Sequence, residues 1–365
     1  MKLQALAATG VRNLRPLTLT PRARFSVFSG DNGQGKTNLL EAIFVIATLR
    51  SFRTARLADL IAFGADQAQL GARVVKDDLV RRYDVALAPT GRKVTLDGKP
   101  ARPLARYFGG FNVVVFTPED LALARAAPAD RRRFLDRGVF TLRPDYLAIA
   151  QDYERVLRSR NAVLRKAADG GVDRRQLEDL LAVYDRQLAD HGARVIAARV
   201  AFVDLVRDEL AAAFTAITRT GLRASARYAI RASDGSAGDL LAQLAASRAK
   251  DLATRATQVG PHRDDLILSL EDRDAGAFAS QGQLRAIMLA WKTAELTVIG
   301  RAHGDPPILL LDDVSSELDP QRNAYLFEHL AALASQCFIT TTHPGHVLLA
   351  GDRADYRIRG GEILE

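Results

Sequence analysis

A run of eight residues near the N-terminus has the residue types and spacing of a phosphate-binding loop. It matches the pattern G-x-x-x-x-G-K-[ST] at every fixed position. An apolar stretch, Phe25–Ser29, precedes it and a helical apolar pattern, Lys36–Leu49, follows it, so we expect a loop between a strand and a helix. Glycines let such a backbone wrap around phosphates, and free amides at the helix start attract anions. The sequence therefore predicts a nucleotide site made by Gly30, Asp31, Asn32, Gly33, Gln34, Gly35, Lys36 and Thr37.

Two side chains of this loop and two later carboxylates have the chemistry to act on ATP. The Lys36 ammonium would reach the terminal phosphates, and the Thr37 hydroxyl would ligate Mg²⁺. An apolar run, Ile308–Leu311, ends in Asp312 and Asp313, which is the pattern of a Walker B strand. We expect Asp312 to hold Mg²⁺ through water and Asp313 to orient or polarise the attacking water.

A third stretch, from Ala279 to Arg285, is similar to the Leu-Ser-Gly-Gly-Gln signature of ABC-type ATPases. The Ser280 hydroxyl and the amides around Gly282 and Gln283 at a helix start suit a γ-phosphate. An ordinary helix cap is the alternative. The stretch lies about 30 residues before the paired aspartates and more than 200 after the phosphate loop, which is the layout of an ABC-type head that carries an inserted arm.

The elements that must position these residues fall into three segments. Residues 1–124 are rich in short alternating strands and contain the phosphate loop, residues 125–221 are helical, and in residues 222–365 strands return. We predict an α/β fold: an ABC-type P-loop ATPase head with mixed sheets, made by the first and third segments, plus an inserted helical, short coiled-coil-like arm. Heptad-like spacing predicts arm helices at Pro144–Lys166 and from Asp173 to about Ile217, with a break at Gly170–Gly171.

Composition narrows the class of protein. The chain has 365 residues, of which 48% are hydrophobic and 26% charged, and it has no apolar run of about 18 to 20 residues, so we expect a globular cytoplasmic protein without a membrane partner. The net charge is +8, and residues 125–175 hold 13 basic and 7 acidic residues, which favours a polyanionic partner. The lone cysteine, Cys337, is expected in the core.

Beyond the ABC-type motifs, several blocks of this chain resemble the RecF family of bacterial recombination and repair ATPases, which is related to SMC and Rad50 proteins. The resemblance covers nearly the full length, and two blocks are specific to it. They are Arg131-Arg132-Arg133-Phe134-Leu135-Asp136 and Gly260-Pro261-His262-Arg263-Asp264-Asp265-Leu266.

The resemblance implies a weak DNA-dependent ATPase in which ATP joins two heads. The phosphate loop of one subunit would face Ser280, Gly282 and Gln283 of the other, and Arg12, Asn13 and Asn38 would belong to the nucleotide site. It also implies binding to gapped DNA or to junctions of single- and double-stranded DNA, and action with RecR and RecO in loading recombinase. Slow hydrolysis would release the dimer.

Some positions depart from the ABC pattern or allow two interpretations. Asp313 stands where ABC transporters have glutamate, which predicts slow turnover. Gln67 and Gln69 are candidates for a glutamine-loop residue. His343 is either a switch histidine or part of a plain turn.

The arginine block Arg131–Arg133 either contacts DNA phosphates or pairs with acids at the base of the arm, and its apolar surroundings favour pairing. The alternatives for the whole chain are an SMC- or Rad50-like chromosome protein, a transporter ATPase subunit or a P-loop kinase. The long insertion argues against a transporter subunit, and a kinase has no use for the Ser280–Gln283 stretch.

Overall fold

The computed structural model describes residues 1–168, 173–232, 234–349 and 351–364, so the predicted Gly170–Gly171 break lies outside the described residues. The chain forms two compact units. Unit 1 comprises Met1–Ala122, Ala213–Thr220 and Gln281–Glu365, and unit 2 comprises Leu123–Ala212 and Gly221–Ser280.

Unit 1 contains a six-stranded antiparallel sheet with the order β2-β1-β4-β5-β6-β7. Its inward positions alternate with outward ones, as the sequence pattern predicts, and turns at Asp77-Asp78 and Asp97-Gly98 with positive φ join neighbouring strands. The strands are β1 (Lys2–Thr9), β2 (Leu17–Leu19), β4 (Ala68–Lys76), β5 (Leu79–Ala88), β6 (Gly91–Leu96) and β7 (Lys99–Pro100).

A second six-stranded sheet of unit 1 has the order β15-β14-β3-β13-β12-β8 and is parallel except for β15. Its central strands read as continuous apolar runs because both faces are covered. The strands are β3 (Phe25–Ser29), β8 (Val113–Phe116), β12 (Ile308–Asp312), β13 (Gln336–Thr341), β14 (Arg353–Arg359) and β15 (Glu362–Leu364).

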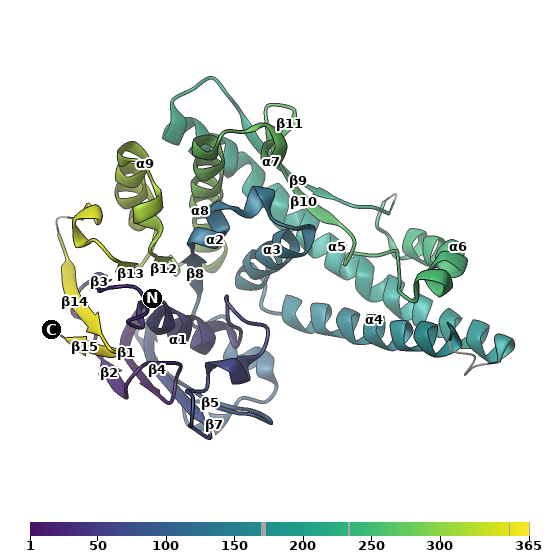
Figure 1. Cartoon of the computed structure of the whole chain (residues 1–365), viewed down its shortest axis with the longest axis horizontal. Coiled ribbons are helices and arrows are strands. Elements are labelled where there is room, and N and C mark those ends of the chain that lie inside the picture. Colours follow the sequence, from purple (N-terminus) through teal and green to yellow (C-terminus); the bar gives the residue numbers. More distant parts are fainter. Residues whose placement is uncertain (169–172, 233, 350, 365) are drawn as a thin grey trace. The chain divides into compact units, whose positions relative to one another are not determined.

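Helix α1 (Lys36–Thr48) packs between the two sheets and shares one hydrophobic core with both (Figure 1). It is apolar nearly all round, as expected for a helix that is buried on every side. The remaining helices of unit 1 are α2 (Pro118–Leu121), α8 (Gln281–His303) and α9 (Pro320–Tyr325). Trp291 of α8 is buried, and so is Cys337 of β13, which confirms the predicted core position of the cysteine.

Unit 2 holds the predicted long helices and a small three-stranded sheet with the order β11-β10-β9. Its helices are α3 (Pro128–Leu142), α4 (Tyr146–Ala168), α5 (Arg174–Thr218), α6 (Ala237–Thr254) and α7 (Ala275–Phe278), and the last residues of α5 count with unit 1. The strands are β9 (Ala224–Ala229), β10 (Asp265–Leu270) and β11 (Arg273–Asp274). Helix α5 has 45 residues, close to the predicted extent.

The compact units and the predicted segments have different bounds. The sequence predicted an arm over residues 125–221 and a head that resumes at residue 222, whereas residues 213–220 pack in unit 1 and residues 221–280 pack in unit 2. Ion pairs within unit 2 join residues that are far apart in the chain. The buried Arg160 of α4 donates to Asp185 of α5 and to Asp251 of α6, each at 2.7 Å, so α6 is fastened to the inserted helices.

No helix in the described part of the chain is long and apolar enough to cross a membrane.

Candidate nucleotide-binding site

The phosphate loop joins β3 to α1, as predicted, and its glycines have backbone conformations that other residues rarely adopt. Gly30, Gly33 and Gly35 have φ values of 157°, 79° and 109°. A Cβ on Gly30 would collide with the carbonyl oxygen of Ile358 in β14. Glycine is therefore required by the backbone shape and by the close approach of the neighbouring strand.

The Lys36 ammonium lies inside the loop that it belongs to. Its Nζ donates to the carbonyl oxygens of Gly30 at 2.5 Å and Asp31 at 3.0 Å. Burial lowers the pKa of Lys36, and the negative charges of Asp313, Asp312 and Asp31 act in the opposite direction. A buried ammonium held only by two carbonyls is well placed to exchange them for phosphate oxygens.

Asp312 ends β12 beside the first turn of α1. One of its carboxylate oxygens, Oδ1, accepts hydrogen bonds from the Thr37 hydroxyl at 2.8 Å and the Thr340 hydroxyl at 2.7 Å. Burial raises the pKa of Asp312, and the hydrogen bonds from Thr340 and Thr37 oppose that rise. The negative charge of Glu119, which follows the neighbouring strand β8, adds to it. A cation at this position would relieve the cost of burying the carboxylate.

Asp313 has a left-handed backbone, with φ 50°, which lets its N–H donate to the Thr340 carbonyl at 3.0 Å and to its hydroxyl at 3.1 Å. Its Oδ1 is buried and has no hydrogen-bond partner among the described residues. A buried carboxylate oxygen without a donor is unusual in a native protein and fits a position for water or a ligand.

The donor set fits Mg²⁺, which prefers one or two oxygen ligands from the protein and keeps several waters. Thr37 and Asp312 already touch each other, and the unpartnered oxygen of Asp313 lies one residue further on. Across the described residues, there is no group of three or more His, Cys, Asp or Glu side chains that would hold a metal alone. The phosphates would therefore have to complete the coordination.

Residues from distant parts of unit 1 brace the phosphate loop. Asn13 donates from Nδ2 to the Gly33 carbonyl at 2.7 Å, and its Oδ1 accepts from Asn38 Nδ2 at 2.6 Å. On the other side, Gly360 N–H donates to Gln34 Oε1 at 2.6 Å, and Gly361 N–H donates to the Gln34 carbonyl at 2.9 Å. The predicted residues Asn13 and Asn38 thus contact the loop or its helix.

The predicted residue Arg12 is held by α1. Its guanidinium donates twice to the carboxylate of the fully buried Glu41, at 3.1 Å each. Glu41 also accepts from the Ser51 hydroxyl at 2.5 Å and from Arg53 at 3.4 Å. Arg53 in turn donates to Asn38 Oδ1 at 2.7 Å, so this network reaches the first turn of the phosphate-loop helix.

The signature-like stretch begins α8. Ser280 precedes the helix, Gly282 and Gln283 lie in its first turn, and a Cβ on Gly282 would come 3.4 Å from the Arg322 guanidinium. The division between the two units falls between Ser280 and Gln281.

The remaining candidates from the sequence are His343, Gln67 and Gln69. His343 is exposed two residues after β13, with its ring 5.3 Å from that of His346. Gln69 lies in β4 opposite Thr9, and Gln67 precedes that strand. Among the described residues, no hydrogen bond joins the side chain of Gln67 or Gln69 to the phosphate loop or the paired aspartates.

The arginine block is engaged inside unit 2. Arg131 forms a double hydrogen bond with Asp265, at 2.8 and 2.5 Å, and Arg132 donates to the Asp264 carbonyl at 2.7 Å. Arg133 is exposed and pairs with Asp130 one turn away. Two of the three arginines therefore hold the Gly260–Leu266 block, in line with the pairing interpretation.

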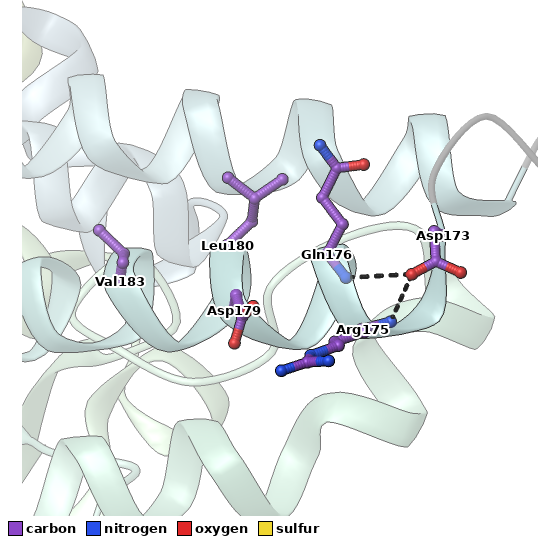
Figure 2. Close-up of a pocket in the computed structure, with 6 residues that line it drawn as sticks. All are labelled: Asp173, Arg175, Gln176, Asp179, Leu180 and Val183. Atoms are coloured by element: carbon purple, nitrogen blue, oxygen red, sulfur yellow. Dashed lines mark hydrogen bonds between the residues drawn. The ribbon is translucent and has the colours of Figure 1, made fainter.

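A separate shallow hollow lies on the first turns of α5 in unit 2 (Figure 2). Asp173 caps this helix by accepting from the N–H groups of Arg175 at 3.1 Å and Gln176 at 3.5 Å. None of the predicted nucleotide-site residues lines it.

Sequence reasoning missed several residues that shape the site. Thr340 contacts both aspartates, Glu41 anchors Arg12, and Gly360 and Gly361 hold Gln34. Of these residues, Thr340 had a detectable signal, because it lies near the end of the apolar strand β13, and polar groups at the carboxyl ends of parallel strands meet at one edge of a sheet.

The family model described as RecF/RecN/SMC N terminal domain matches residues 2–359. A protein named DNA replication and repair protein RecF from an Anaeromyxobacter species is 43% identical over 100% of this chain and 99% of its own length. The protein of the same name from Myxococcus xanthus is 41% identical over 100% of this chain and 97% of its own length.

Solved structures of the same family and of a related fold are similar to this chain. The recombination mediator protein RecF-ATP in the RecFOR pathway matches with a TM-score of 0.88 and 29% identity, over 99% of this chain and 96% of that one. An Smc head bound to the C-terminal winged-helix domain of ScpA matches with a TM-score of 0.55 and 13% identity, over 100% of this chain and 98% of that one, which is a likeness of fold alone.

Proposed function

The chain belongs to the RecF family within the RecF/RecN/SMC class, and from this membership we propose that it is an ATP-dependent DNA-binding protein of recombinational repair. ATP would bring two heads together on gapped DNA or at a junction of single- and double-stranded DNA. The dimer would help RecR and RecO to load recombinase, and slow hydrolysis would release it. Because its DNA would be chromosomal, the protein would act in the cytoplasm.

The observation that carries the proposal is the hydrogen bond between Thr37 and Asp312, because it joins the phosphate loop to the end of β12, where the two aspartates lie. The amides of Gly33 to Thr37 would bind phosphate oxygens, and Lys36 would exchange its two carbonyls for the terminal phosphates. Thr37 and Asp312 would hold Mg²⁺, which would supply charge neutralisation on the phosphates. Asp313 would accept a hydrogen bond from the attacking water with its free Oδ1.

The other predicted residues have supporting roles in this proposal. Ser280, Gly282 and Gln283 would close over the γ-phosphate of the partner subunit. Arg12, Asn13 and Asn38 would keep the phosphate loop in shape and contact the nucleotide from its side. His343 would report on the γ-phosphate from the neighbouring strand end.

Two variants test the ATP-switched dimer. Under the proposal, Asp313→Asn retains ATP binding, loses hydrolysis by about a hundredfold or more, and accumulates as a dimer in gel filtration with ATP. Lys36→Arg should stay monomeric with ATP, because the planar guanidinium does not fit the carbonyl cradle of the ammonium. A dimer that forms equally with and without nucleotide in the unmodified protein would reject the proposal.

A further inference from the structure

One face of the antiparallel sheet of unit 1 is exposed in the part of the chain that the structure describes. On β4 the residues Leu70, Ala72 and Val74 are buried against the core, whereas the alternating positions Gln69 and Arg73 are exposed. The pattern continues across β5, where Tyr83, Val85 and Leu87 are the buried positions. We call the opposite side, formed by Gln69, Gly71, Arg73, Arg82, Asp84, Ala86, Lys93 and Thr95, the outer face; none of these residues is buried.

Two arginines of the outer face stand directly opposite each other. Arg73 of β4 pairs with Arg82 of β5 in the strand register. Like charges at such positions destabilise a sheet, because directly opposite Cβ atoms are only about 4.5–5.5 Å apart. On a surface whose only role is to face water, an acid opposite a base would give a more stable sheet than two bases.

One carboxylate on the outer face offsets one of its three basic side chains. Asp84 accepts from Arg82 Nε at 3.1 Å and from the Thr95 hydroxyl at 3.4 Å, so it pairs with Arg82. Among the residues that the structure describes, Arg73 and Lys93 have no ion-pair partner or side-chain hydrogen bond. Lys93 extends the basic surface to β6, where it lies opposite Ala86.

Small residues lie between the basic ones. In the register, Arg73 neighbours Ala5 of β1, Gly71 neighbours Ala7, and Lys93 neighbours Ala86. The long basic side chains therefore extend beyond the small residues beside them. An extended, rigid partner would contact these side chains before it reached the backbone of the sheet. None of the eight described residues that form the outer face is aromatic, and Tyr83 of β5 is on the buried side. Without aromatic rings the face has nothing on which to stack unpaired bases.

From this geometry we infer that the outer face of the antiparallel sheet is a contact surface for the phosphate backbone of duplex DNA, with Arg73, Arg82 and Lys93 as its phosphate-binding residues. The inference rests on the proposed function, since it names the surface through which the ATP-bound protein holds the double-stranded side of its DNA. Binding at this face releases counterions and is independent of base sequence.

Arg73→Glu tests the inference because folding and binding respond in opposite directions. An acid opposite Arg82 removes the like-charge repulsion, so the thermal midpoint should equal or exceed that of the unmodified protein. Duplex binding measured by fluorescence anisotropy should weaken about tenfold at physiological salt, and the slope of log K against log salt should become shallower by about 1 to 2. Lys93→Gln should make the slope of log K against log salt shallower by about 1.

Arg227→Glu is the matched control. Arg227 is an exposed arginine on β9, an antiparallel strand of unit 2, and it undergoes the same change of charge. The inference requires that this variant keeps the duplex affinity and the salt slope of the unmodified protein. Equal losses in Arg73→Glu and Arg227→Glu would mean that only net charge matters and would overturn it.

Two failures are distinguishable. If the unmodified protein with ATP does not bind duplex or gapped DNA, the proposed function itself fails. If it binds but Arg73→Glu and Lys93→Gln bind equally well and keep the salt slope, only the outer face is wrong, as it would be if this face held an acidic protein surface instead.

Discussion

At the scale of single residues, the site depends on hydroxyl groups as much as on charges. Thr340 illustrates this, because its side chain donates to Asp312 Oδ1 while its hydroxyl and carbonyl oxygens both accept from Asp313 N–H. One buried threonine thus orients the carboxylate of Asp312 and holds the backbone of Asp313. Such outer-shell partners commonly affect activity by 10–100-fold without touching the ligand.

Thr340→Val should therefore lower ATP hydrolysis by about 10–100-fold. The valine keeps the shape of the threonine but leaves Asp312 with only the Thr37 hydrogen bond. Affinity for ATP without Mg²⁺, measured with a fluorescent analogue, should change by less than about threefold, since the phosphate loop is untouched. Thr340→Ser, which keeps the hydroxyl, should retain most activity; if serine and valine lose equal activity, the hydroxyl has no orienting role.

At the scale of elements, the phosphate loop is not a self-contained turn. It is held from one side by Asn13, which follows β1, and from the other by the turn between β14 and β15. The chain therefore places residues more than 300 positions apart in the sequence against the same loop. The conformation of the loop is a property of unit 1 and not only of its glycine content.

Two adjacent glycines of the β14–β15 turn make it possible to test whether the turn braces the phosphate loop. Substitutions at the two positions share the backbone strain but differ in their contact with Asn13. A Cβ on Gly361 would collide with the Asn13 carbonyl oxygen, whereas a Cβ on Gly360 meets nothing within 4 Å. Both have positive φ, so both alanine variants pay for the backbone conformation. Only Gly361→Ala must also displace Asn13, at about 1–3 kcal/mol.

We expect Gly361→Ala to weaken ATP binding by about tenfold, which is 1.4 kcal/mol, and Gly360→Ala to leave it nearly unchanged. Isothermal titration of ATP into each variant measures the difference. Equal ATP affinities in the two variants would show that the β14–β15 turn does not brace the phosphate loop.

At the scale of the whole molecule, unit 2 is held together by buried ions. Arg160 is fully buried and joins α4 to α5 and α6 through Asp185, Asp251 and the Thr257 hydroxyl, the last at 2.9 Å. Arg248 adds a second cation to Asp185 at 2.8 Å. Such a network defines which segments belong to the unit more than it adds net stability.

Removing the Arg160 cation from this network should lower the stability of the protein. Arg160→Met leaves two buried carboxylates with less compensation and should destabilise the protein by about 3–5 kcal/mol, measured as a loss in urea unfolding followed by circular dichroism. Arg155→Met is the control, because Arg155 forms an exposed pair with Asp152 on the same helix and should cost at most about 1 kcal/mol. A similar cost for both variants would contradict the role given to Arg160.

The elements of the nucleotide site were predictable because local rules create them. The phosphate loop needs glycine at positive φ before a helix start, and Thr117 and Asp319 cap helices that begin with proline. The paired aspartates end a buried parallel strand. Each feature depends on a few consecutive residues, so each leaves a readable pattern.

By itself, the sequence determined the strand-loop-helix unit, the acidic strand, the antiparallel hairpins and the two long helices, since each rests on short-range periodicity or turn chemistry. Only the tertiary structure decided which segments join unit 2, what Arg131 and Arg132 contact, and that Thr340, Glu41 and the Gly360–Gly361 turn surround the phosphate loop. These outcomes depend on hydrogen bonds and ion pairs between residues that are far apart in the chain. The register of the sheets and the packing of the helices bring such residues together, and no local run of amino acids specifies either.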